Sequence, residues 1–323
     1  MAQTFLGKGF SVDVISFQNY QFHPKKNYDF FISARTNLEQ IASRLNRDCV
    51  KVAHLDTAHW LFNNHAAYMR LLELQQRRGV ALTNAKMVEP NKAIEQADLA
   101  TILGNRFTEE TYRYAQKKIY RIPISAPTLY SWDDKKDFEQ CRNNYLWFGS
   151  SGFVHKGLDR VLEAFAAMPE YRLTICGPLD SEKTFTKTYH KELFETPNID
   201  AVGWTDVNSP RFTEIARNTL GLIYPTCSEG GGGSAITCMH AGIIPILSYQ
   251  ASVDVYDAGV ILDDSSITTI QHAVQKLSSR PATVLEQQAR LAWKTARSNH
   301  TRETFAARYA KFVSQTLLDE PSG

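Results

Sequence analysis

Short apolar runs rich in β-branched residues alternate along this chain with longer segments of helical period, and this alternation constrains the fold more than any other feature. It predicts parallel α/β domains, in which each helix crosses over a sheet from one strand to the next. At 323 residues the chain is long enough for two such domains, each with its own core.

The expected strands of the first half cover residues 11–17, 28–33, 49–55, 99–104 and 119–124. Those of the second half cover residues 145–150, 171–177, 199–204, 220–225, 243–248 and 259–264. A polar, proline-started stretch at 126–144 indicates the boundary between the halves. We therefore expect an N-terminal Rossmann-like domain over residues 1–140, a C-terminal one over 141–300, and a helix in 301–323 that packs back on the first. Ligands bind such parallel sheets in the crevice at the carboxyl ends of the strands.

Composition excludes several classes of protein. No run approaches the 18 apolar residues of a membrane span, and the first residues lack the pattern of a signal peptide. The five cysteines form no CxxC pair, which fits a reducing cytosol and predicts a cytoplasmic protein.

The charge is divided unevenly between the two halves. Residues 1–144 carry 20 Lys and Arg against 15 Asp and Glu, whereas the rest of the chain has a net charge of −3. A basic first half favours an anionic acceptor or peripheral contact with the inner face of a membrane, although a mildly biased solvated surface explains it as well. The dense basic stripe of a nucleic-acid-binding protein is missing from the sequence.

The most informative stretch is residues 220–247, where an expected buried strand leads through a glycine-rich loop into a helix. Glu229 precedes Gly230, Gly231, Gly232 and Gly233, and the helix is expected to begin near Ser234. Glycines let backbone N–H groups approach a ligand without a Cβ clash, and a helix N-terminus adds unpaired donors and a positive dipole end. The pattern predicts a phosphate site, with a flexible linker as the alternative.

The same glycines formally satisfy the dinucleotide fingerprint GxGxxA, with Asp254 about twenty residues on. Four glycines match almost any glycine pattern, however, and residues 226–229 intervene between the strand and the run. An NAD-dependent dehydrogenase therefore stays a weaker alternative.

A second stretch, residues 145–165, has a related organisation. An expected strand ends in Gly149, Ser150, Ser151 and Gly152, and Lys156 stands at the start of an amphipathic helix. A lysine at this place can offset the charge of a diphosphate, while a solvated helix-entry lysine is the simpler alternative.

These two stretches together resemble the nucleotide-sugar-binding domain of the retaining glycosyltransferase family 4, whose members have the GT-B fold. The family pattern of a glycine-rich first turn and a helix-entry lysine is matched by FGSSGFVHKGLDRVLEAF, and its Pro-Ser-x-x-Glu-Gly-x-Gly pattern by PTCSEGGGGSAITCMHAGIIPIL. The resemblance covers residues 145–260 well and the first half only in outline.

The resemblance implies a role for each matching residue. Glu229 would bind hydroxyls of the donor sugar, and Gly231 to Gly233 would give N–H groups to its diphosphate. Lys156 would contact the diphosphate, with Ser150 and Ser151 nearby, and the turn that ends in Trp204 would lie beside the base. The implied substrate is a nucleoside-diphosphate sugar, used without a metal or a separate cofactor, and the acceptor is an unidentified sugar, lipid or small molecule.

Three positions depart from the family pattern. Thr237 stands where the family has a second Glu that binds the ribose, and Ser150 stands where it usually has an Arg. Residues 1–17 resemble the tail of a first helix and a second strand, so the first strand and its glycine-rich loop are expected to be missing. Thr237 predicts weak nucleotide binding, and a non-catalytic sugar- or nucleotide-binding protein with a decayed site is an alternative.

In the first half, His54, Asp56 and His59 fall at or just after the end of an expected strand. His59, before a helix, is the candidate for a catalytic role there. Zinc binding by His54, His59 and His65 is not expected, because spacings of five and six do not align on one helix face.

Overall fold

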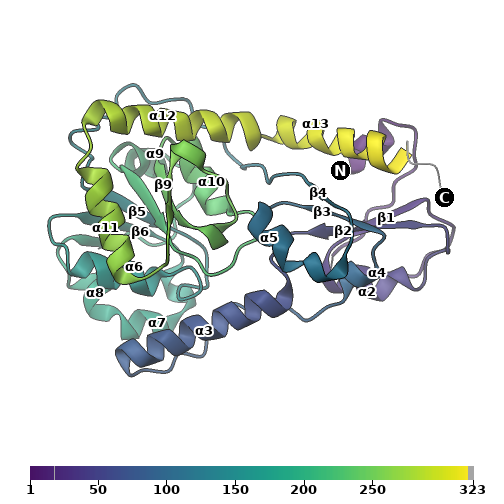
Figure 1. The fold of residues 1–323 in the computed structure, drawn as a ribbon, viewed down its shortest axis with the longest axis horizontal. Helices are drawn as coiled ribbons and strands as arrows, with labels where there is room; N and C mark the ends of the chain where they lie inside the picture. Colours follow the sequence, from purple (N-terminus) through teal and green to yellow (C-terminus); the bar gives the residue numbers. More distant parts are fainter. Residues whose placement is uncertain (18, 319–323) are drawn as a thin grey trace.

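The computed structural model describes residues 1–17 and 19–318, and it has two α/β domains joined side by side (Figure 1). The first domain contains a four-stranded parallel sheet in the order β1-β2-β3-β4, with Phe30 opposite Val50 and Val52 opposite Leu99. Its strands are β1 (Phe30–Ser33), β2 (Val50–Leu55), β3 (Leu99–Ile102) and β4 (Ile119–Arg121).

The second domain contains a six-stranded parallel sheet in the order β10-β9-β8-β5-β6-β7. Its strands are β5 (Asn144–Phe148), β6 (Arg172–Cys176), β7 (Ile199–Ala201), β8 (Gly221–Tyr224), β9 (Ile244–Ser248) and β10 (Val260–Leu262). The strand order reverses between β5 and β8, so the sheet is doubly wound with its switch point between these two strands.

Helices flank both sheets. Those of the first domain are α1 (Ala2–Leu6), α2 (Arg35–Ala42), α3 (Trp60–Arg78), α4 (Ala93–Gln96) and α5 (Arg106–Thr111). The later ones are α6 (Leu158–Ala166), α7 (Lys183–Thr188), α8 (His190–Phe194), α9 (Pro210–Arg217), α10 (Gly233–His240), α11 (Ile267–Ser278), α12 (Ala282–Asn299) and α13 (Arg302–Phe312). Short 3₁₀ turns cover Arg113–Ala115, Leu179–Ser181, Tyr249–Ala251 and Tyr256–Ala258, and a π-helical turn covers Val313–Leu318.

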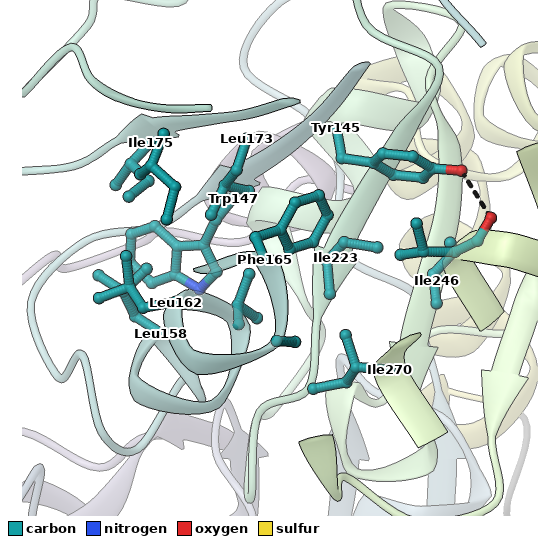
Figure 2. Close-up of a cluster of buried hydrophobic side chains, with 14 of the residues drawn as sticks. Tyr145, Trp147, Leu158, Leu162, Phe165, Leu173, Ile175, Ile223, Ile246 and Ile270 are labelled. Atoms are coloured by element: carbon teal, nitrogen blue, oxygen red, sulfur yellow. Dashed lines mark hydrogen bonds between the residues drawn. The ribbon is translucent and has the colours of Figure 1, made fainter. Parts of the chain in front are cut away.

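The second domain has one core cluster that includes its sheet and α6, and a second that joins the sheet to α9, α10 and α12. Leu158, Leu162 and Phe165 on α6 are fully buried against Trp147 of β5, as the helical spacing of this segment predicts (Figure 2). On the same strand, the Tyr145 hydroxyl lies 2.6 Å from the Ser278 hydroxyl, so its buried oxygen is paired. This packing fixes the position at which the chain leaves β5.

Two long helical segments bridge the domains, one on each side of the molecule (Figure 1). At the C-terminal end, α13 packs on the first domain, where Tyr309 and Phe312 share a buried cluster with Val52 and Leu99. On the other side, α3 reaches across to the second domain, and its Leu74 belongs to that domain's core. The two domains are therefore connected by two separate helical contacts, one through α3 and one through α13.

The strand expected at residues 11–17 is wrong. This segment is irregular and mostly exposed, with Val14 79% and Phe17 73% accessible, whereas β1 at the edge of the sheet pairs with β2. Residues of this segment make other contacts: Val12 packs beside the cluster that contains Tyr309 and Phe312, and Asp13 accepts a hydrogen bond from Tyr28 at 2.6 Å. A segment with an alternating pattern forms a strand only where it can pair with the edge of a sheet.

Candidate functional site

Two loops leave neighbouring strands at the switch point of the second sheet. β5 and β8 pair in parallel, with Tyr145 opposite Gly221, and the chain then runs to opposite sides of the strand order. The carboxyl ends of such strands diverge and form the usual ligand crevice of a doubly wound sheet. The loop after β5 covers residues 149–157, and the loop after β8 covers residues 225–232.

His155 ties these two loops together. Its Nε2 lies 2.6 Å from the carbonyl oxygen of Ser228, and its own carbonyl accepts the N–H of Cys227 at 2.9 Å. Burial lowers the pKa of His155 to about 4, so the ring is neutral and its Nε2–H donates to Ser228. Gly157 allows the loops to touch, because a Cβ there would lie 2.7 Å from the carbonyl oxygen of Pro225.

This anchoring brings several predicted site residues into one polar cluster. Lys156 Nζ lies 3.9 Å from Glu229 Oε1, and these side chains are only 3% and 16% exposed. Lys156 also donates to the Ser150 hydroxyl at 3.2 Å and to the Ser151 carbonyl at 2.8 Å. Glu229 Oε1 accepts the Tyr224 hydroxyl at 2.8 Å. The two loops, which the sequence predicts to lie close together, are therefore in contact in the structure.

The two charged groups of this cluster are strongly perturbed. The pKa of Lys156 is lowered to about 7, chiefly by burial; the Glu229 carboxylate opposes the shift and the charge of Lys86 adds to it. Burial disfavours ionisation of Glu229, but the charges of Lys86 and Lys156 outweigh this effect and hold its pKa below the ordinary value. Such a pair is ionised near neutral pH, yet its lysine is close to losing its proton.

The glycine run divides into a covered and an accessible part. Gly231 is buried, with the space for a Cβ closed by Ile124 at 3.3 Å and Leu103 at 3.5 Å. Gly232 is buried in the left-handed conformation (φ 57°) as the N-cap of α10. Gly233 is exposed and Ser234 half-buried at the start of α10, so these two offer the more accessible backbone.

Residues 225–232 separate the strand β8 from the helix α10, which argues against the dinucleotide fingerprint.

Two further predicted residues lie at different depths. Thr237 is buried on α10, and its hydroxyl donates to the Gly233 carbonyl at 2.9 Å. Trp204 follows β7 and is 71% exposed. It lies at the same sheet edge as Lys156, because Gly177 after β6 bonds to the Gly203 carbonyl and Gly149 after β5 bonds to Cys176. An accessible aromatic ring at this edge can stack against a base.

Gly152 has a different environment from the one its predicted role requires. Its N–H is taken by the buried Glu182 carboxylate, which also accepts the N–H of Phe153 at 3.2 Å. Its left-handed conformation (φ 89°) instead leaves room for the side chain of Lys86, which comes from the first domain. Sequence reasoning missed both Glu182 and Lys86, because each lies in an irregular segment with neither a motif nor a period.

His59 belongs to another part of the first domain. It is the N-cap residue of α3, and its ring contacts Trp60, Tyr112 and Tyr114, with Nε2 3.1 Å from the Tyr114 hydroxyl. Burial lowers the pKa of His59 against the opposing effect of Glu95. The structure thus places His59 in an aromatic cluster and does not join it to the Lys156–Glu229 pair.

Residues 1–17 and 19–318 contain neither a metal-binding cluster nor a membrane-spanning helix. No group of three or more His, Cys, Asp and Glu side chains in this range is arranged to hold a metal ion. None of the helices described is both long and apolar enough to cross a membrane.

The amino-acid sequence matches no protein-family model and no curated protein. The fold, in contrast, is shared with solved glycosyltransferase structures. HepE from Anabaena, in complex with UDP and glucose, aligns with a TM-score of 0.63 and 13% identity over 89% of this chain and 78% of its own. Sucrose-phosphate synthase from Thermosynechococcus elongatus aligns with a TM-score of 0.64 and 14% identity over 89% of this chain and 73% of its own.

A third similar structure is WaaG, a glycosyltransferase involved in lipopolysaccharide biosynthesis, with a TM-score of 0.55 and 15% identity over 85% of this chain and 80% of its own. At these identities the similarity establishes the fold alone. The chain is an α/β protein of the GT-B type, with two parallel sheets whose carboxyl edges face each other, as the sequence predicts.

Proposed function

We propose that this protein is a retaining glycosyltransferase of the family 4 type, which moves a sugar from a nucleoside-diphosphate sugar to an acceptor hydroxyl. The observation that carries the proposal is the buried Lys156–Glu229 pair at the switch point, beside the N-terminus of α10. A cation and a helix N-terminus together favour a diphosphate, and the adjacent carboxylate can accept hydrogen bonds from sugar hydroxyls.

In the proposed reaction the bond between the anomeric carbon and the phosphate oxygen breaks, and its electron pair leaves on the diphosphate. The acceptor oxygen bonds to the anomeric carbon, and the acceptor's proton passes to the released diphosphate. Lys156 and the start of α10 would stabilise the charge that develops on the leaving group, the dominant contribution in such a reaction. Glu229, fixed by Tyr224, would orient the sugar.

The structural comparisons support a nucleotide-sugar donor, because HepE was solved with UDP-glucose as well as with UDP and glucose. The acceptor is a sugar, a lipid or another small molecule, and the activity is proposed to be cytoplasmic, at the inner face of a membrane where the acceptor is a lipid. Donor turnover separates this function from that of a non-catalytic nucleotide-binding protein.

UDP is expected to bind without a divalent metal ion, because Lys156 and the α10 N-terminus already supply positive potential. Isothermal titration calorimetry should give the same dissociation constant in EDTA as in magnesium or manganese. Binding that EDTA abolishes and a metal restores would contradict this proposal. If UDP, GDP and ADP all fail to bind, the donor class itself is wrong.

The affinity for UDP is expected to fall as the pH rises above 7. In the free protein Lys156 has a pKa of about 7, and a bound diphosphate raises that pKa because it favours the charged lysine. Below pH 7 the lysine already holds its proton and adds no further dependence on pH, although protonation of the terminal phosphate of UDP at about pH 6 weakens binding there. Above pH 7 binding must take up a proton, so the dissociation constant rises by up to about tenfold per pH unit. Titrations from pH 6 to 9 measure this, and a level profile would contradict it.

A further inference from the structure

Lys86 belongs to the first domain, but its side chain lies in the site of the second. A Cβ added to Gly152 would be 2.8 Å from Cδ of Lys86 and 3.2 Å from its Cβ, so the lysine stem runs directly over this turn. The positive charge of Lys86 acts on Lys156 and helps to lower the pKa of that lysine. Lys86 also acts electrostatically on Glu229 and Glu182, the two carboxylates that border the turn.

The backbone that carries Lys86 is fixed by two buried asparagines of α3. Asn63 Nδ2 donates to the Lys86 carbonyl at 3.0 Å. The Asn64 side chain accepts the N–H of Val88 at 2.8 Å and donates to the Val88 carbonyl at 2.9 Å. Breaking these bonds would leave buried polar groups of Asn63 and Asn64 without partners, which is unfavourable. The bonds therefore hold the irregular segment on the helix. The backbone at Lys86 is thus held in place before any ligand arrives.

The helix that holds this segment is itself docked on the second domain. Arg70 of α3 is buried and donates to the Pro225 carbonyl at 2.7 Å, at the start of the loop that carries Glu229. Farther along, Arg77 pairs with the buried Asp159 of α6 at 2.6 Å. The position of Lys86 is therefore set by the domain contact as a whole and not by a loop contact alone.

Lys86 and Lys156 share this cluster with two carboxylates, Glu229 and Glu182. The charge of Lys86 is one of the causes that lower the pKa of Lys156, so protonating both lysines at once is unfavourable without an added anion. Of the two neighbouring carboxylates, Glu182 is already engaged by the N–H groups of Gly152 and Phe153. A ligand that brings two negative charges would allow both lysines to be protonated, and a diphosphate is such a ligand.

We propose that Lys86 is a second cationic ligand of the donor diphosphate, contributed by the first domain opposite Lys156. The inference rests on the proposed function and adds a residue to it. Its consequence is that the diphosphate is held from both domains, so that loss of the domain contact also loosens the nucleotide. Asn63 and Asn64 act as positioning residues for this lysine.

The test is calorimetric titration of UDP into the full-length protein at pH 8, carried out in two buffers of different ionisation enthalpy. Lys86→Met keeps an unbranched side chain over Gly152 but removes the charge. We expect it to weaken UDP binding about ten- to a hundredfold, the effect of one charge-assisted hydrogen bond. We also expect it to reduce proton uptake on binding, because Lys156 without a neighbouring cation holds its proton in the free protein.

Two companion variants complete the experiment. Lys86→Arg should keep most of the affinity, and Lys92→Met, at an exposed position of the same segment, should leave it unchanged. Unchanged affinity and unchanged proton uptake in Lys86→Met would overturn the inference while the proposed function stands. If titration of UDP, GDP and ADP into the wild-type protein gives no more heat than titration into buffer, the proposed function fails, and the inference fails with it.

Discussion

Glu229→Gln is expected to lower sugar transfer and UDP-glucose hydrolysis by about 100- to 1,000-fold, the loss typical of one preorganised polar group in an active site. Gln keeps the size of Glu and one acceptor oxygen, but it loses the charge that binds sugar hydroxyls strongly. UDP has no sugar beyond its diphosphate, so its affinity should change much less than the hydrolysis rate, and only through the altered charge beside Lys156. Hydrolysis rates and UDP titrations on the same preparation measure both effects.

Glu170→Gln is the matched control, because it makes the same chemical change at an exposed position in the turn before β6. It should leave both quantities unaltered. Equal loss of hydrolysis and of UDP affinity in Glu229→Gln would show that Glu229 acts through the structure of its loop. The bonds that it accepts from Tyr224 and Thr226 would then be the reason.

The second domain could be predicted well because its information is local. The apolar positions of α6 recur at helical spacing, and the two loops that meet at Lys156 and Glu229 each follow a mainly apolar strand. Parallel strands place their carboxyl ends at one edge, so two motifs far apart in the sequence had to come close together. Pattern and topology were sufficient there.

The contribution of the first domain to this site could not be predicted in the same way. Lys86 lies in an irregular segment, and its place depends on Asn63, Asn64 and the docking of α3 on the second domain. Each of these contacts joins residues distant in sequence or in different domains, and none produces a period or a motif. His59 shows the converse, since a suitable residue type at a strand end proved to lie among aromatic rings.

The largest effect on the domain contact is expected from Gly230→Ala. A Cβ at this position would lie 2.1 Å from the Asp56 carbonyl oxygen and 2.5 Å from Cα of Thr57. Both atoms belong to the backbone of the first domain just after β2, so no side chain can turn away to make room. Overpacking costs about 1–3 kcal/mol, and a clash of the added Cβ against fixed backbone should lower the free energy of unfolding by about 3 kcal/mol.

Gly233→Ala supplies the control three residues away in the same run. Its added Cβ would meet only Ile124 Cδ1 at 3.9 Å, an ordinary contact. Alanine also has a higher helix propensity than glycine at this position in the first turn of α10. Thermal denaturation should therefore show a lower midpoint for Gly230→Ala and an unchanged or higher one for Gly233→Ala. Small-angle scattering should show a larger radius of gyration for Gly230→Ala, because the clash is relieved only when the two sheets move apart. If the two variants have equal midpoints and equal radii, Gly230 does not touch Asp56 in solution, and the domains stand farther apart than the structure places them.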